Sequence, residues 1–188
     1  MEPLLTTFIA AAFGEFGDKT QLLVVALALR YGRPASILAG VALAALANSL
    51  IAAAGGILIH DMITLRAVSL LVALGLLFAG GSGLISLRPR VSVTGWRTPA
   101  FVTAAGSFFV AEFGDRTQFL TGALAAQYDS LALAALGATA GIVAANAPAA
   151  LLGPRLGELL PLTAIRIVVA CLFLLVGFIV AVNALRLT

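Results

Sequence analysis

The amino-acid sequence predicts an all-α polytopic membrane protein with six transmembrane helices, arranged as two inverted-topology three-helix repeats. The first observation is composition: of 188 residues, 62% are hydrophobic and only 10% are charged, whereas soluble domains are about 25% charged. The second is a set of six apolar runs, each long enough for the roughly 20 residues with which a helix crosses a bilayer. The third is a motif, EFGD[KR]TQ, that begins at Glu15 and again at Glu112, each time inside an apolar run.

The six runs cover most of the chain, in the order 4–29, 35–59, 65–87, 100–126, 131–153 and 162–185. The first follows Met1-Glu2-Pro3, which lacks the basic residues of a signal peptide, so we interpret it as a span of the mature protein. The second and third contain glycines typical of close helix contacts. The fourth carries the second motif, and the fifth contains Asn146. The sixth is almost entirely apolar, and its Cys171 is predicted to be a packing residue.

Basic residues predict the orientation of the chain in the membrane. Outside the motifs, seven arginines lie in or beside the loops after the first, third and fifth runs, namely Arg30, Arg33, Arg88, Arg90, Arg97, Arg155 and Arg166. Only Arg66 and Arg186 flank the opposite side. By the positive-inside rule these three loops are cytoplasmic, and both termini lie on the non-cytoplasmic side. This distribution also accounts for the isoelectric point of about 9.8, so we predict no nucleic-acid partner.

The two halves of the sequence are one unit, duplicated. A shift of 97 residues superimposes the two motifs and also matches Tyr31 with Tyr128, Gly40 with Gly137, Gly56 with Gly153, Leu77 with Leu174 and Gly80 with Gly177. We therefore divide the chain into repeat 1 (1–87), a basic cytoplasmic linker (88–99) and repeat 2 (100–188). Each repeat has an odd number of spans, so the second enters the membrane from the opposite side. Such inverted repeats are typical of secondary transporters, whose substrate site lies near the midplane.

Both motifs lie near the middle of their runs, so their charged side chains are expected near mid-bilayer. On one continuous helix, Glu15 and Asp18 would be about 60° apart and point the same way. Gly17 would lie on the opposite side, where it allows a close neighbour or local unwinding. An ionised carboxylate at this depth costs about 2.5–3.5 kcal/mol, and the two motifs contain four. Lys19 and Arg116 leave a charge of −2, which one divalent cation or two protons would cancel. We therefore predict an exchanger of a divalent cation against protons.

The side chains of the motifs offer oxygen donors, which suit Ca²⁺, Mn²⁺ or Mg²⁺ better than copper or zinc. The predicted metal ligands are the acidic and amide residues of both motifs: Glu15, Asp18, Gln21, Glu112, Asp115 and Gln118. The predicted supporting residues are Thr20, Thr117, Lys19, Arg116, Asn48 and Asn146. Each asparagine serves either as a neutral ligand or as a hydrogen-bonding contact between helices. His60, at a span end, is interpreted as an interfacial residue, with a proton sensor as the alternative. No cofactor is predicted, because the cation is the substrate.

Two copies of E-x-G-D-[KR]-[TS] in a duplicated three-span unit resemble the transmembrane-protein-165/Gdt-type family of divalent cation/proton exchangers. The stretches from Glu15 to Thr20 and from Glu112 to Thr117 fill every position of this pattern, and the similarity in layout covers nearly the whole chain. The resemblance implies exchange of Mn²⁺ or Ca²⁺ for protons, with the acidic residues of both motifs forming the cation path. It also implies a protein of the bacterial inner membrane that exports Mn²⁺ from the cytoplasm.

Three other interpretations stay open. An exporter of an amino acid or another small organic cation would use Lys19 and Arg116 to bind a substrate carboxylate. An intramembrane aspartyl protease would use Asp18 and Asp115 to activate water, although the G-x-G-D pattern of that family is absent. In the third interpretation the motifs are buried ion pairs that only lock the helices together, which four acids and two bases fit poorly. The sequence does not predict an oligomeric state.

Overall fold

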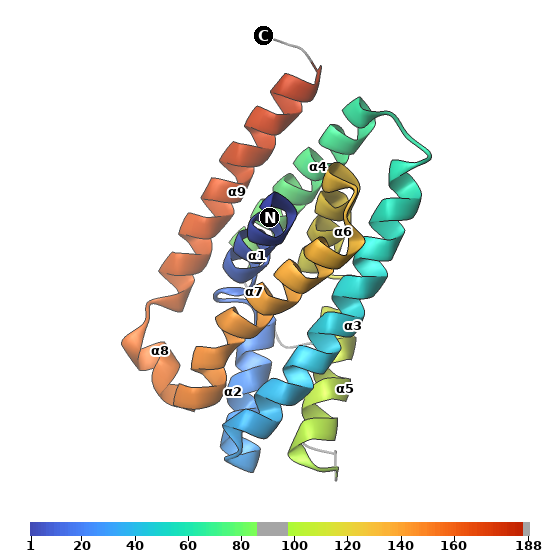
Figure 1. Ribbon diagram of the computed structural model, residues 1–188. Helices are drawn as coiled ribbons and strands as arrows, with labels where there is room; N and C mark the ends of the chain where they lie inside the picture. Colours follow the sequence, from blue (N-terminus) through green and yellow to red (C-terminus); the bar gives the residue numbers. More distant parts are fainter. Residues whose placement is uncertain (86–97, 186–188) are drawn as a thin grey trace.

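The computed structural model describes residues 1–85 and 98–185 (Figure 1). Every regular element within these residues is a helix: α1 (Glu2–Glu15), α2 (Lys19–Tyr31), α3 (Pro34–His60), α4 (Leu65–Leu84), α5 (Ala100–Glu112), α6 (Arg116–Tyr128), α7 (Leu131–Leu152), the 3-10 helix η1 (Gly153–Arg155), α8 (Leu156–Leu159) and α9 (Leu162–Leu185). The all-α prediction is confirmed. Most of the predicted linker, with Arg88, Arg90 and Arg97, lies outside the described residues, as does Arg186.

Four segments of the described chain are long and apolar enough to cross a membrane: Pro34–His60, Leu65–Leu84, Leu131–Leu159 and Leu162–Leu185. Large apolar side chains, such as Leu43, Phe78 and Phe178, are exposed on the outer faces of these helices. Contact of such side chains with water is unfavourable, whereas contact with the apolar tails of lipids is not. The chain is therefore a polytopic helical membrane protein.

The two runs that carry the motifs are not continuous helices, so the prediction of one helical face for Glu15 and Asp18 is wrong, whereas the local unwinding that the glycines were expected to allow is present. The first run forms α1 and α2, and the fourth forms α5 and α6. At each break the glycine, Gly17 or Gly114, has a positive φ, of 73° and 72° respectively, which a right-handed helix does not contain. The aspartate after each glycine has an extended conformation and is the N-cap residue of the next helix. Glu15 and Asp18 therefore share no helical face, because Glu15 ends α1 and Asp18 precedes α2.

The most extensive helix contacts join the two halves of the chain. Helix α1 packs on α7, and its counterpart α5 packs on α3; α2 contacts α7 as α6 contacts α3; and α4 packs along α9 (Figure 1). Glycines allow the closest approaches. A Cβ added at Gly40 would lie 2.6 Å from the carbonyl oxygen of Phe101, and one added at Gly137 would collide with the carbonyl oxygen of Leu4. The same contact is thus made twice, with the roles of the halves exchanged.

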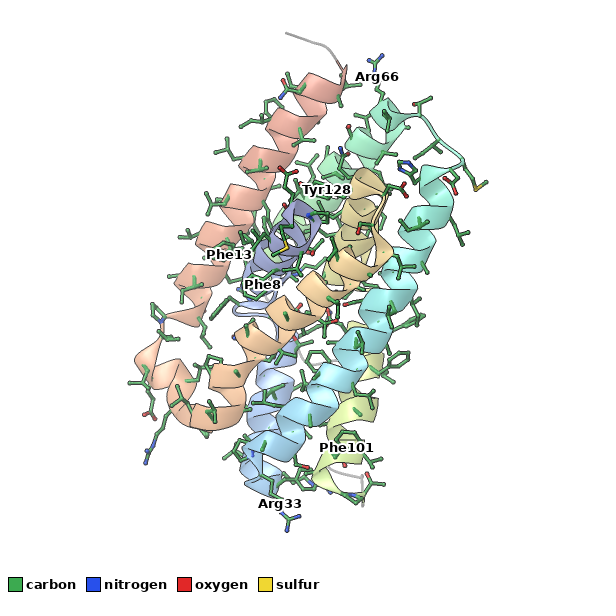
Figure 2. The ribbon with its side chains drawn as sticks, viewed as in Figure 1. Phe8, Phe13, Arg33, Arg66, Phe101 and Tyr128 are labelled. Atoms are coloured by element: carbon green, nitrogen blue, oxygen red, sulfur yellow. The ribbon has the colours of Figure 1, made fainter. Side chains whose placement is uncertain are left out.

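Two matching tyrosine contacts join the halves away from the motifs. The hydroxyl of Tyr31, at the end of α2, lies 2.8 Å from Thr103 Oγ1 in α5. The hydroxyl of Tyr128, at the end of α6, lies 3.1 Å from Thr6 Oγ1 in α1. Figure 2 shows Tyr128 in the upper part of the molecule and Phe101, close in sequence to Thr103, at the lower end. We refer to these two hydrogen bonds as the lower clasp (Tyr31–Thr103) and the upper clasp (Tyr128–Thr6).

Candidate functional site

The two helix breaks bring the two motifs into direct contact. Lys19 Nζ lies 2.6 Å from Asp115 Oδ2, and Arg116 Nη2 lies 2.9 Å from Asp18 Oδ1. Each basic residue therefore pairs with the aspartate of the other motif, and all four side chains are buried. Each aspartate also precedes a helix, whose positive N-terminal end favours a negative charge. Arg116 Nη2 donates in addition to the carbonyl oxygen of Gly14, 2.8 Å away, so it also binds the last turn of α1.

Neither glutamate of the motifs pairs with a basic side chain within the described residues. Glu15 accepts hydrogen bonds from Thr20 Oγ1, 2.5 Å from Oε2, and from Thr117 Oγ1, 2.8 Å from Oε1. Glu112 is also buried, yet within the described chain neither of its carboxylate oxygens has a hydrogen-bond partner. The two glutamates are thus equivalent in sequence but not in their environment.

Two asparagines next to the motifs also present unpartnered oxygens. Asn48 Oδ1 in α3 and Asn146 Oδ1 in α7 are buried and have no donor among the residues that the structure describes, although both amide nitrogens donate to backbone carbonyls. A buried oxygen that lacks a donor is costly, and a bound cation would supply the missing partner. Within the described residues, however, no group of three or more His, Cys, Asp or Glu side chains is arranged to hold one metal ion. In this conformation the aspartates face basic side chains instead.

The two glutamines of the motifs make the same pair of contacts in each half. Gln21 Oε1 accepts a hydrogen bond from Gly17 N–H at 2.9 Å, and its Nε2 donates to the carbonyl oxygen of Ala145 in α7 at 2.6 Å. Gln118 Oε1 accepts from the glycine of its own break at 2.6 Å, and its Nε2 donates to the carbonyl oxygen of Asn48 in α3 at 3.2 Å. Ala145 and Asn48 are 97 residues apart, as are the two motifs. We refer to each set of two hydrogen bonds as a glutamine bridge.

Two cavities are each lined by the aspartate and the glutamine of one motif. The larger, of about 920 Å³, is lined by Asp18 and Gln21 together with residues of the α8–α9 region, including Arg166. The smaller, of about 280 Å³, is lined by Asp115 and Gln118 together with α6 and the C-terminal part of α3. In Figure 1, α8 lies at the lower left and the end of α3 at the upper right. Equivalent positions of the two motifs therefore face cavities on different sides of the molecule.

The structure thus brings the predicted acidic, basic, threonine and glutamine residues together and places the two asparagines on the adjacent helices α3 and α7. His60 lies apart from this cluster, with Nδ1 2.7 Å from the carbonyl oxygen of Ala126 at the end of α6. The sequence analysis missed the glutamine bridges. Their only signal is the glutamine shared by the two motifs, and nothing local indicates that its partner lies on a helix of the other half.

The model of the family described as "Divalent cation/proton antiporter GDT1" matches the chain twice, over residues 3–90 and 100–187. A protein of Vibrio cholerae serotype O1 (strain ATCC 39541 / Classical Ogawa 395 / O395), named "Putative manganese exporter", is 39% identical over 180 residues, which are 94% of this chain and 89% of that protein. No solved structure matched the chain.

The family match distinguishes between the interpretations of the buried acids. Antiporters move ions and cleave no peptide bond, so the aspartyl protease interpretation is wrong. The match covers both halves, each with its own motif. The chain belongs to the GDT1 family of divalent cation/proton antiporters.

Proposed function

We propose that this protein exchanges a divalent cation, Mn²⁺ before Ca²⁺, against protons, and that it exports Mn²⁺ from the cytoplasm across a bacterial inner membrane. The observation that carries the proposal is the buried contact between the two motifs, which gathers four carboxylates and only two basic groups. The oxygen donors of the site suit Mn²⁺ and Ca²⁺. The name of the Vibrio cholerae relative supports Mn²⁺ and export.

The ion pairs divide the four acids into two kinds. The aspartates are balanced by the basic residues of the opposite motif, so the excess charge of −2 falls on Glu15 and Glu112. Burial and neighbouring negative charges favour the protonated form of a carboxyl group, whereas a bound cation favours the ionised form. Two protons on the glutamates, or one divalent cation between them, neutralise the same charge. Occupancy by one therefore excludes the other, which is the physical basis of exchange.

We assign the first contact with the cation to the aspartates and its deeper binding to the glutamates. Asp18 and Asp115 each line one cavity, so a cation that arrives from either side meets an aspartate first. The unpartnered Oδ1 atoms of Asn48 and Asn146 offer neutral oxygens to the same ion. The two threonine hydroxyls that now bind Glu15 release it when the cation takes their place.

We further propose six spans in two inverted repeats, with α1–α2 and α5–α6 as discontinuous spans. The separate match of the family model to each half supports this arrangement, as do the paired contacts of α1 on α7 and α5 on α3. Broken helices that meet at a midplane ion site are typical of inverted-repeat transporters, in which one half rocks against the other. Arg33 and Arg66 lie at opposite ends of the molecule (Figure 2), which fits loops on opposite membrane faces and both termini on the non-cytoplasmic side.

The remaining alternatives have less support. An amino-acid or organic-cation exporter needs Lys19 and Arg116 to bind a substrate carboxylate, but an aspartate already holds each of them. Ion pairs that only lock the helices together do not account for Glu112, whose buried carboxylate has no hydrogen-bond partner in the described chain.

The proposal is tested with the purified chain in liposomes that contain a pH-sensitive dye. Addition of Mn²⁺, Ca²⁺ or Mg²⁺ outside is expected to drive proton movement, fastest with Mn²⁺, and Glu15→Gln and Asp115→Asn are expected to abolish it. Glu2→Gln removes an exposed carboxylate far from the motifs, so this matched control should leave exchange unchanged. Absence of proton movement with all three cations, or undiminished exchange in both motif variants, would overturn the proposal.

A further inference from the structure

We propose that Gln21 and Gln118 are positioning residues that hold each motif break against the opposite half, rather than ligands of the cation. The inference rests on the proposed exchange at the motif acids, but it gives the glutamines a role that the motif pattern did not indicate. The evidence for this role is the two glutamine bridges. The glutamines are 97 residues apart in the sequence, and so are their partners.

The partners of each glutamine require a side chain that both accepts and donates a hydrogen bond. A backbone N–H only donates and a backbone carbonyl only accepts, so the side chain between Gly17 and Ala145 must present one acceptor and one donor. Glutamine presents both, whereas an ionised carboxylate has only acceptors and would face the carbonyl oxygen of Ala145 without a hydrogen. A ligand of a hard divalent cation has the opposite requirement, because a carboxylate binds such a cation better than an amide does. The two roles therefore predict opposite effects of a glutamate substitution.

Each bridge holds the part of the chain that carries the acids. Gly17 lies between Glu15, at the end of α1, and Asp18, the N-cap residue of α2, so a hydrogen bond to its N–H restrains both. The other end of this bridge lies on α7, next to Asn146 with its unpartnered Oδ1. In the second bridge the acceptor is the carbonyl group of Asn48 itself. The bridges thus set how far the acids of one half lie from the asparagine oxygen on the other.

The two bridges differ in burial and in the length of the hydrogen bond that crosses to the other half. Gln21 is buried and donates over 2.6 Å, whereas Gln118 is half-buried and donates over 3.2 Å. A short, buried hydrogen bond is costly to lose. We therefore expect substitutions of Gln21 to have the larger effect on transport.

The first test compares Gln21→Glu and Gln21→Met, with the same changes at Gln118. Gln127 is exposed at the end of α6, so its Glu and Met variants are matched controls. In liposomes, both Gln21 variants are expected to lower the maximal rate of Mn²⁺-dependent proton movement about tenfold. In detergent, neither variant should bind Mn²⁺ more tightly than the wild type. Tighter Mn²⁺ binding by Gln21→Glu, or a wild-type rate in that variant with lost binding in Gln21→Met, would make the glutamine a ligand and overturn the proposal.

The second test does not depend on transport. Hydrogen exchange of peptides that contain Gly17 or Gly114 should speed up in the Met variant of the same motif, because the acceptor of the glycine N–H is gone. In the Glu variant a carboxylate oxygen still accepts, so exchange at the glycine should stay slow. Unchanged exchange in both Met variants would overturn the bridges even if transport were lost. If the wild type moves no protons, the proposed function is wrong. The hydrogen-exchange measurement still shows whether the glutamine bridges exist. Thermal unfolding identifies any variant that has lost its fold, and the half-buried Gln118 position then carries the comparison.

Discussion

At the scale of single residues, the two motifs share one sequence pattern but differ in their contacts. Glu15 accepts hydrogen bonds from two threonine hydroxyls, whereas Glu112 has none within the described residues. A buried, unpaired carboxylate destabilises a fold. Packing therefore does not explain Glu112, and the binding of protons and a cation in turn that we propose for it would.

Replacement of Glu112 by glutamine is expected to abolish exchange without lowering stability. The change removes a buried carboxyl group that has no hydrogen-bond partner within the described residues, so the thermal midpoint of the purified protein should equal or exceed that of the wild type. Glu15→Gln removes one of the two acceptors used by Thr20 and Thr117 and is expected to cost about 1 kcal/mol. Thermal unfolding of both variants beside the liposome assay measures this difference. A larger loss of stability in Glu112→Gln than in Glu15→Gln would contradict it.

The ion pair between Lys19 and Asp115 provides a second prediction. Lys19→Met leaves a buried aspartate unpaired, which is expected to cost about 3–5 kcal/mol of unfolding free energy. Addition of Asp115→Asn should recover most of this loss, because the unpaired charge is gone, but it should not restore exchange. A double-mutant cycle on the unfolding free energy measures the coupling. Additive losses in the double variant would show that the two residues do not stabilise each other.

At the scale of elements, one glycine in each motif turns a predicted span into two helices. The break allows Glu15 and Glu112 to end helices while the aspartates precede helices. In a continuous helix the backbone groups of the motif would form hydrogen bonds within the helix. The glycine N–H would then not be available to donate to the glutamine side chain. The breaks therefore create the polar contacts of the site.

Alanine substitutions at the two glycines are expected to differ in cost. Both glycines have a positive φ, so each change costs about 1–2 kcal/mol in backbone strain. A Cβ at Gly17 would also lie 2.7 Å from the carbonyl oxygen of Leu162, whereas one at Gly114 meets no described atom within 4 Å. Gly17→Ala should therefore lower the unfolding free energy more than Gly114→Ala does. Equal losses would contradict the close approach of the start of α9 to the first break.

At the scale of the whole molecule, polar side chains connect the two halves at three heights. The ion pairs of the motifs lie between the lower clasp and the upper clasp. At the lower clasp the hydroxyl of Tyr31 has a second partner, because it donates to the carbonyl oxygen of Thr98 at 3.0 Å. In the proposed alternating access, one half rocks against the other and the two ends open in turn. Each clasp is therefore expected to break when its own end opens.

The clasps predict opposite effects of two conservative substitutions. Tyr31→Phe should favour opening at the lower end and Tyr128→Phe at the upper end, each by about two- to tenfold, because one hydrogen bond contributes about 0.5–1.5 kcal/mol. A single cysteine introduced at Leu160 or Ala52, one in the lining of each cavity, reports the change as its rate of labelling in a Cys171→Ser background. Shifts in the same direction for both tyrosine variants would contradict the role of the clasps.

The sequence was enough to predict the helical membrane class, the duplication and the four acids, because these depend on composition, run length and a repeated motif. It also predicted that the motifs meet, since an inverted repeat brings two mid-bilayer segments to the same depth. The continuous helices over 4–29 and 100–126 were wrong. The mean hydropathy of a long run changes little with one glycine, so it does not indicate a break. The positive φ of Gly17 goes with a hydrogen bond from its N–H to the side chain of Gln21, which hydropathy does not predict.

The sequence by itself therefore determined the helical membrane class, the excess of acidic over basic residues in the motifs and the family to which the chain belongs. Only the tertiary structure decided which base pairs with which aspartate, that the glutamines reach across to α3 and α7, and that Glu112 rather than Glu15 lacks a hydrogen-bond partner within the described residues. The physical reason is that these partners lie on opposite halves of the chain. Their distances are set by how the helices pack, and no pattern along either half records that packing.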